Sequence, residues 1–303
     1  MAGVYGRQAY VLSMNVDLPD GRTLEYVVDG PDDGLPLVFH HGSPGAALLF
    51  PLITDAAARA GLRTVMHSRP GYAGSTARPG RTIADVAGDV AALVDALGAD
   101  RFVTVGWSGG GPHALATAAL LPDRCQAAAT MAGVAPYAGE GLDWVAGMGQ
   151  ENVEEFGAAV AGEAALSAYL ETQASVLARV TGADIIAALG DLVSDVDKRA
   201  LTGEFADYMA ASFRASVSAG IAGWRDDDLA FVADWGFPVD RLTVPVAVWQ
   251  GAQDRMVPFD HGRWLIAHVA GVQAHLEPGE GHLSLIANFD TILADLLRAA
   301  GIR

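Results

Sequence analysis

Short apolar runs that alternate with helical patterns decide what this chain can fold into. The runs are PLVFHH, LRTVMHS and RFVTVG, and the helical patterns cover 46–60, 83–97 and the residues after Ser108. Strands connected by helices form a parallel sheet with helices on both of its faces. Two earlier strands, at about 10–18 and 23–29, are joined by the turn residues PDG and predict a β-hairpin. The sequence therefore predicts an α/β fold with a mostly parallel central sheet flanked by helices.

The pattern of apolar residues changes in the second half of the chain. From about 136 to 237 the apolar residues follow helical periodicity, and no convincing strand occurs. The sheet pattern resumes in the run VPVAVWQG, followed by a helix at about 259–269, the strand VQAHLEP and a last helix at about 283–298. We therefore expect a core formed by 1–135 and 238–303, with an inserted all-helical lid at 136–237.

The charge balance argues against two classes of partner. The chain has 19 Lys and Arg against 36 Asp and Glu, which gives a net charge of −17 at pH 7. Such a field repels the phosphates of nucleic acids and anionic membrane surfaces. No run of about twenty apolar residues and no signal-peptide pattern occurs. We expect a soluble, cytoplasmic protein that binds no nucleic acid and no membrane, while its oligomeric state stays open.

The stretch VTVGWSGGGPHALA places Ser108 on a sharp turn from a strand to a helix. Four glycines, at positions 106, 109, 110 and 111, surround this serine. Glycine is favoured where a side chain would clash or where φ must be positive. The glycines therefore predict a tight turn that holds the Ser108 hydroxyl outward, as a nucleophile requires.

A serine nucleophile needs a histidine base and a carboxylate that orients the histidine. Asp254 follows the apolar run VAVWQ in a polar turn, and His282 lies in a glycine-flanked loop after the last strand. We therefore predict a catalytic triad of Ser108, Asp254 and His282. Glu140 and Asp143, which follow an earlier strand, are the competing carboxylates.

Four histidines recur every seven residues, a spacing that suggests metal ligands. They are His261, His268, His275 and His282. The strand VQAHLEP and its flanking glycines interrupt the series, so the four side chains do not lie on one helix. We expect no metal site and no cofactor.

Five ordered motifs resemble those of the α/β-hydrolase fold superfamily over nearly the whole chain. They are HHGSPG (40–45), SRPGYAGS (68–75), GWSGGG (106–111), GAQDRMVP (251–258) and GEGHLSL (279–285). They resemble the oxyanion loop, the Arg-Pro-Gly-Tyr loop, the nucleophile elbow, the acid loop and the histidine loop of serine-nucleophile members that carry a helical lid. Ser68 departs from the family, in which aspartate is common at that position.

The resemblance also implies an oxyanion hole. Its donors would be the backbone N–H groups of Ser43 and Gly109. Two such donors stabilise the negative charge of a tetrahedral intermediate, by roughly 3 to 4 kcal/mol each in comparable sites. Gly109 also lies at the start of the helix after Ser108, where the helix dipole favours an anion.

A serine at the elbow indicates an acyl-enzyme intermediate and argues against haloalkane dehalogenases and epoxide hydrolases, which resemble this chain but use aspartate there. We expect hydrolysis of a carboxylic ester of a small or medium apolar substrate. The alternatives are a proline iminopeptidase-like aminopeptidase, a C–C bond hydrolase or lactonase, and a ligand-binding protein without catalysis. The aminopeptidase requires acidic lid groups for the substrate ammonium. The lid contains Glu151, Glu154, Glu155, Glu163 and Glu171, although their helical spacing is typical of a solvated face.

A pocket that binds an apolar small-molecule substrate needs an apolar wall. Trp107, beside the nucleophile, is the aromatic residue whose position itself suggests a pocket wall. His41, in the predicted oxyanion loop, and Trp144 and Met148, in the predicted lid, are the other expected substrate-binding residues.

Overall fold

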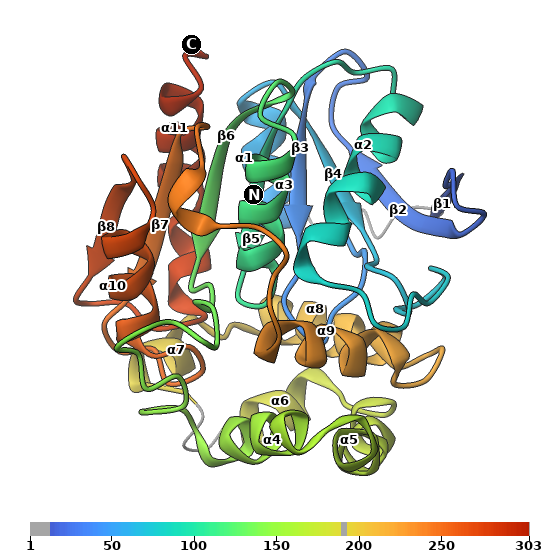
Figure 1. The fold of residues 1–303 in the computed structure, drawn as a ribbon, viewed down its shortest axis with the longest axis vertical. Coiled ribbons are helices and arrows are strands. Elements are labelled where there is room, and N and C mark those ends of the chain that lie inside the picture. Colours follow the sequence, from blue (N-terminus) through green and yellow to red (C-terminus); the bar gives the residue numbers. More distant parts are fainter. Residues whose placement is uncertain (1–12, 189–192, 303) are drawn as a thin grey trace, which may run out of the picture.

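The computed structural model describes residues 13–188 and 193–302 and forms one eight-stranded sheet flanked by helices (Figure 1). The strand order is β1-β2-β4-β3-β5-β6-β7-β8. The strands are β1 (Met14–Asp17), β2 (Thr23–Asp29), β3 (Leu35–His40), β4 (Leu62–His67), β5 (Phe102–Trp107), β6 (Cys125–Met131), β7 (Val246–Gly251) and β8 (Gln273–Glu277). β1 and β2 pair antiparallel, β2 pairs antiparallel with β4, and all later pairs are parallel. The predicted mostly parallel sheet is confirmed.

Helices cover both faces of the sheet. They are α1 (Pro51–Arg59), α2 (Val86–Ala96), α3 (Gly110–Leu120), α10 (Phe259–His268) and α11 (Phe289–Ala299). α1 packs against α11, and α2 packs against α3. Alternating strand residues face opposite layers, so Phe39 of β3 contributes to the apolar layer of α1 and α11, whereas Val38 contributes to the layer of α2, α3 and α10.

The predicted core helices are present with shifted starts. α1 begins at Pro51 rather than near residue 46, because Phe50 is extended and proline suits the first helical position. The last helix begins at Phe289 rather than 283, after a short 3₁₀ turn at Ser284–Asn288. Residues 10–12 of the expected hairpin lie outside the described residues.

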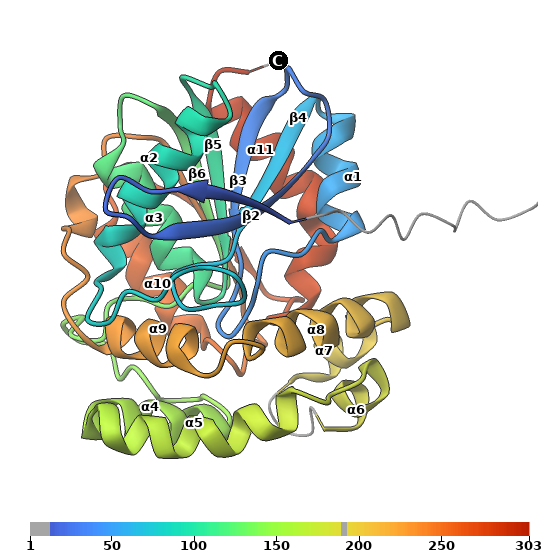
Figure 2. The same cartoon turned by 90° about the vertical axis from the view of Figure 1, so that its right-hand side faces the viewer.

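The described residues between β6 and β7 form six α-helices that gather at one end of the sheet (Figure 2). We call them the cap helices: α4 (Gln150–Ala161), α5 (Glu163–Leu177), α6 (Gly182–Ala188), α7 (Asp195–Ala200), α8 (Gly203–Ser216) and α9 (Ala222–Val232). α8 and α9 lie next to the sheet, and α4 and α5 form an outer layer that packs against α9. In 13–188 and 193–302 no helix is both long and apolar enough to cross a membrane.

Candidate active site

Ser108 lies on the turn between β5 and α3. Its φ is +56°, an unusual value for a residue other than glycine. The turn is possible because its neighbours are small: a Cβ on Gly106 would overlap the carbonyl of Gly110, and one on Gly110 would overlap the carbonyl of His40. The Ser108 N–H donates to the Met131 carbonyl at 2.9 Å. The local fold thus holds Ser108 at the carboxyl end of β5, on the wall of a pocket.

His282 and Asp254 meet at the ends of the last two strands. His282 Nδ1 lies 2.9 Å from Asp254 Oδ2, and both side chains are buried. Asp254 Oδ1 accepts the backbone N–H groups of Met256 and Val257 at 2.9 and 2.8 Å. An Nδ1–H donated to the carboxylate leaves the lone pair of the neutral ring on Nε2. His282 lines the same pocket as Ser108.

The His282 imidazole is a stronger base than its burial alone would make it. Burial lowers its pKa, but the charge and the hydrogen bond of Asp254, together with the charge of Asp197, outweigh burial and raise the pKa above its usual value. The ring is therefore suited to accept a proton from a hydroxyl group near neutral pH.

Asp197, a cap residue that the sequence did not identify, holds the loop of His282. Its carboxylate accepts the backbone N–H groups of three consecutive residues, His282 at 3.0 Å, Leu283 at 2.8 Å and Ser284 at 2.9 Å. Its side chain is completely buried. A Cβ on Gly281 would overlap this carboxylate, so the loop needs glycine there. The charged pattern DVDKRA is that of a solvated helix, and nothing in it distinguishes Asp197 from its exposed neighbours.

The predicted oxyanion loop lies beside Ser108. A Cβ on Gly42 would be 3.4 Å from Ser108 Cβ, and one on Gly109 would be 2.6 Å from Ser43 Oγ. Ser43 and Gly109 are therefore brought together next to Ser108, and both line the pocket. Gly109 directly precedes α3, where unpaired N–H groups favour negative charge.

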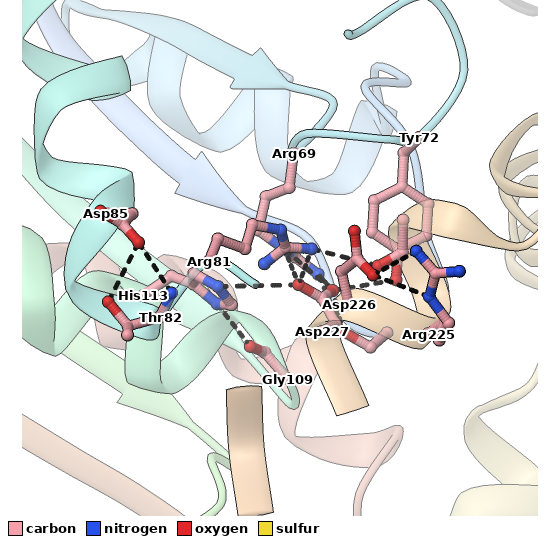
Figure 3. Close-up of polar contacts among 12 residues, drawn as sticks. Arg69, Tyr72, Arg81, Thr82, Asp85, Gly109, His113, Arg225, Asp226 and Asp227 are labelled. Carbon is pink, nitrogen blue, oxygen red and sulfur yellow. Dashed lines mark hydrogen bonds and ion pairs between the residues drawn. The ribbon is translucent and has the colours of Figure 1, made fainter. Parts of the chain in front are cut away.

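A buried ionic cluster around Asp227, which includes Arg69, Tyr72 and Arg81 (Figure 3), contacts the predicted oxyanion loop. Arg69 donates to the carbonyls of His41 (2.6 Å) and Gly42 (3.1 Å) and to Ser43 Oγ (2.8 Å). Its partner is Asp227 of α9, at 2.6 Å, which also accepts the Ser43 hydroxyl at 2.6 Å. The loop is thus connected directly to a cap helix.

Asp227 is fully buried but remains charged. Arg81 contacts it at 2.7 Å and the Tyr72 hydroxyl donates to it at 2.9 Å. Burial would raise its pKa, but the Arg69 and Arg81 guanidinium groups hold the pKa well below its usual value. The Arg-Pro-Gly-Tyr motif marks the loop of Arg69 and Tyr72, whereas the pattern WRDDDLA carries no sign that Asp227 is buried. Ser68, the departure from the family, donates to Glu25 at 3.0 Å and accepts the Ala47 N–H at 2.9 Å.

A cavity of about 370 Å³ opens in front of Ser108. Trp107 and His41 line it, and the Trp107 indole donates to the His282 carbonyl at 3.3 Å. Trp144 and Met148 are not among its lining residues in the described chain, which corrects that prediction. Trp144 is instead buried, with its indole donating to the Ala135 carbonyl at 2.7 Å. The lining otherwise comes mainly from apolar residues of the cap helices, among them Val176, Leu177, Ile185, Met209 and Phe213.

The competing carboxylates and the other histidines of the seven-residue series lie outside the cavity lining. Glu140 and Asp143 are exposed and do not line the cavity. His261 is buried against the Ala135 N–H and the Trp144 carbonyl, and His275 pairs with Asp295 at 2.9 Å. In the described part of the chain no group of three or more His, Cys, Asp or Glu could hold a metal ion.

Together, a carboxylate-oriented imidazole, a hydroxyl on a strained turn and N–H groups at a helix start suit acyl transfer. Residues 36–289 match the model of a family described as alpha/beta hydrolase fold. The non-heme chloroperoxidase of Streptomyces lividans is 31% identical over 255 residues, which cover 80% of this chain and 83% of that protein.

Two solved structures illustrate the structural likeness. The alpha/beta hydrolase fold protein from Nakamurella multipartita is 26% identical, with a TM-score of 0.65 over 96% of this chain and 100% of that one. The esterase from Exiguobacterium antarcticum is 17% identical and shares the fold, with a TM-score of 0.66 over 95% and 100% of the two chains.

Proposed function

Because the chain belongs to the alpha/beta hydrolase fold family, we propose that it is a serine carboxylesterase for small or medium, largely apolar esters. The observation that carries this proposal is the buried His282–Asp254 pair, whose histidine lines the same pocket as a positive-φ serine. An aspartate at the elbow would direct the chemistry toward an alkyl-enzyme, whereas a serine forms an acyl-enzyme.

The proposed reaction has two stages. His282 takes the Ser108 proton as the hydroxyl oxygen attacks the ester carbonyl, and the Ser43 and Gly109 N–H groups stabilise the oxyanion. The imidazolium then protonates the leaving alcohol, which departs and leaves acyl-Ser108. A water molecule, deprotonated by His282, hydrolyses the acyl-enzyme and restores the serine. Residues 136–237 would act as a lid that closes the pocket, and Trp107 and the apolar cap residues would bind the substrate.

A relative named a bifunctional esterase/perhydrolase, of Acinetobacter calcoaceticus, is 34% identical over 128 residues, 40% of this chain and 44% of that protein, and favours a second candidate reaction of the same acyl-enzyme. Hydrogen peroxide could replace water, so that acyl-Ser108 and H₂O₂ yield a peracid and free serine. The atoms balance without a metal or an electron donor. The two reactions share every step up to acylation, so the deacylating nucleophile alone separates them.

A panel of p-nitrophenyl esters, acetate through decanoate, together with proline p-nitroanilide, tests the proposal. We expect ester hydrolysis by the native protein and a loss of at least about 10⁴-fold in Ser108→Ala. Ser218→Ala, at an exposed serine of the cap, is the control and should match the native rate. Cleavage of the anilide alone would favour the aminopeptidase. Peracid formation with acetate and H₂O₂ would favour perhydrolysis. No turnover of any substrate by folded protein would count against the esterase.

A further inference from the structure

Gln250 is a buried amide next to the candidate acid. It lies on β7, whose six residues are all buried, and its own side chain is completely buried. Val248 faces the layer of α2, α3 and α10, so Gln250, two residues further along the strand, faces the same layer. Removing an amide from water costs free energy unless its hydrogen bonds are replaced. The hydrogen bonds that Gln250 makes therefore have to explain its place in the core.

Both amide hydrogens of Gln250 go to the acid loop, residues 251–258. Nε2 donates to Asp254 Oδ2 at 3.1 Å and to the Val257 carbonyl at 2.8 Å. A carboxylate and a carbonyl only accept, so the amide has to turn its nitrogen, rather than its oxygen, toward them. Gln250 Oε1 receives no hydrogen bond from the described residues. The orientation of the amide is therefore determined by Asp254 and Val257.

The bond from Gln250 completes the set of donors around the Asp254 carboxylate. Oδ1 accepts the backbone N–H groups of Met256 and Val257, whereas Oδ2 lies 2.9 Å from His282 Nδ1 and 3.1 Å from Gln250 Nε2. Among the described residues, Gln250 is the donor to Oδ2 that takes no part in the proposed proton transfer. Without it, the histidine alone would hold the oxygen that has to orient the histidine.

The packing of α10 fixes the stem of this side chain. α10 packs against β7, and a Cβ on Gly262 of α10 would overlap Cβ and Cγ of Gln250. Glycine at this position lets the helix approach the strand closely. The stem of Gln250 is thus enclosed between strand and helix, so its amide keeps one direction toward Asp254.

Building on the proposed esterase activity, we propose that Gln250 is a positioning residue for the candidate triad. Its amide N–H holds Asp254 Oδ2 toward His282 Nδ1, and so keeps the imidazole in the tautomer whose Nε2 accepts the Ser108 proton. Gln250 does not line the cavity. Its effect should therefore pass through Asp254 and change the rate of proton transfer rather than the binding of substrate.

Gln250→Met tests this inference, because methionine has a similar length and no N–H donor. We expect kcat and kcat/KM for p-nitrophenyl butyrate at pH 8 to fall about tenfold or more, since a displaced carboxylate misorients the base, with KM changed less than about threefold. Gln253→Met is the matched control. Gln253 is exposed in the same loop and donates to the Pro278 carbonyl at 3.3 Å, so its variant should stay within about twofold of the native rate. A loss of less than about threefold in Gln250→Met would overturn the inference.

The same substitution in Asp254→Asn separates positioning from packing. The oxygen of the new amide can keep the two backbone N–H groups, and its nitrogen then takes the place of Oδ2, where Gln250 finds no acceptor. If Gln250 acts through Asp254, adding Gln250→Met to Asp254→Asn should change the residual kcat/KM by less than about twofold. An equal loss in both backgrounds would mean that Gln250 acts by packing or through Val257, and would overturn the inference.

Gln250→Glu is a second variant, which decides the question if Gln250→Met does not fold. It keeps the shape of the side chain and replaces the donor by a carboxylate oxygen. Beside Asp254 two carboxylates repel each other, so we expect a loss of about tenfold or more at pH 8. In Asp254→Asn the new amide nitrogen can donate to the introduced carboxylate, so no further loss should follow. Equal losses in the two backgrounds would again contradict positioning through Asp254.

Failure of the esterase proposal would be visible separately. If the native protein hydrolyses no ester, the rate at which an alkyl fluorophosphonate labels Ser108 replaces kcat/KM in the same comparison, followed by mass spectrometry. The serine oxygen displaces fluoride from phosphorus, and its proton passes to His282. Labelling that is about tenfold slower in Gln250→Met, with no such difference in the Asp254→Asn background, would support positioning without an esterase. Equal rates in native protein and Gln250→Met, or no labelling of the native protein, would overturn it.

Discussion

The core and the cap contribute to the candidate active site in different ways. The core supplies Ser108, Asp254 and His282 from the ends of its strands; Ser108 and His282 line the pocket, and Asp254 pairs with the His282 ring. The cap supplies Asp197 and Asp227, whose carboxylates hold the loops of His282 and Ser43 from behind. Ser108 and His282 are placed for the proposed chemistry, whereas the cap residues position other groups. The difference indicates that the cap helices fix the loops of the candidate site.

Asp227 and Asp228 show the same contrast between consecutive residues. Both are fully buried on α9, yet the pKa of Asp227 is lowered and that of Asp228 is raised. Burial acts in the same direction on both, so the partners decide the sign. Asp227 faces arginines of the core, and Asp228 faces Glu155 of the cap. Burial alone therefore does not predict the charge state of a carboxyl group in this protein.

The largest effect should follow from a change in the core. Asp254→Asn keeps the shape of the side chain but removes the charge that orients His282 and raises its pKa. We expect kcat for p-nitrophenyl butyrate to fall by roughly 10³- to 10⁴-fold with the fold intact. Asp260→Asn, at an exposed position of α10, serves as the control and should stay within twofold. A loss of less than tenfold in Asp254→Asn would mean that another carboxylate orients His282.

The next largest effect should follow from a substitution in the cap, and it should lower the free energy of unfolding. Asp227→Asn would leave Arg69 and Arg81 buried without their shared carboxylate, and breaking such a buried pair costs about 3 to 5 kcal/mol of unfolding free energy. Urea denaturation at pH 7 measures this value. Asp290→Asn breaks the exposed pair with Arg59 and should cost at most about 1 kcal/mol. If the two variants lose similar amounts of unfolding free energy, the buried pair does not contribute more to stability than the exposed pair, which would contradict this prediction.

The difference in unfolding free energy between the native protein and Asp227→Asn should depend on pH with a definite sign. The folded-state pKa of Asp227 lies well below its ordinary value, so its contribution is fully present above the unfolded pKa of about 3.9. It is lost as the pH falls through the folded-state pKa. The stability gap between native protein and Asp227→Asn should therefore be constant from about pH 5 to 7 and should narrow below about pH 4. A gap that widens in acid would contradict the charged state of Asp227.

These residues also show what the sequence could and could not reveal. Strand ends, glycine-rich turns and the order of Ser108, Asp254 and His282 are local patterns, and the structure brings these three residues to one pocket region. Asp197 and Asp227 lie in acidic helical segments, where periodicity favours exposure; only the docking of the cap on the core buries them. The aromatic and apolar character of Trp144 and Met148 does not distinguish a pocket wall from the interior of the protein, where both side chains are buried.

A smaller effect should connect the cap to the chemistry of the core. Asp197→Asn removes a negative charge that raises the His282 pKa and replaces one of the two carboxylate oxygens that accept three backbone N–H groups. His282 must be neutral to act as a base, so activity rises as the pH passes its pKa. We expect the acidic limb of the kcat/KM profile to move to lower pH. Asp195→Asn, exposed on the same helix, should not move it; an unmoved limb in Asp197→Asn would limit Asp197 to a structural role.

The smallest effect tests whether the core or the cap limits the length of the acyl chain that the pocket accepts. Trp107→Phe shortens a core side chain that lines the pocket and removes its hydrogen bond to the His282 carbonyl. The space gained accommodates about one or two methylene groups, each worth about 0.8 kcal/mol when buried. We therefore expect the kcat/KM ratio of p-nitrophenyl decanoate to butyrate to rise roughly fourfold, with kcat for the preferred ester changed less than threefold.

Trp235→Phe is the matched control for this prediction, because it removes an equivalent indole hydrogen bond, to the Phe231 carbonyl at 3.3 Å, from a buried residue outside the pocket lining. The control separates a gain of pocket space from a general loss of packing. If the two variants have the same length profile as the native protein, Trp107 does not limit the acyl chain. The cap residues that line the cavity, Met209 and Phe213 first, would then determine which substrates the core can process.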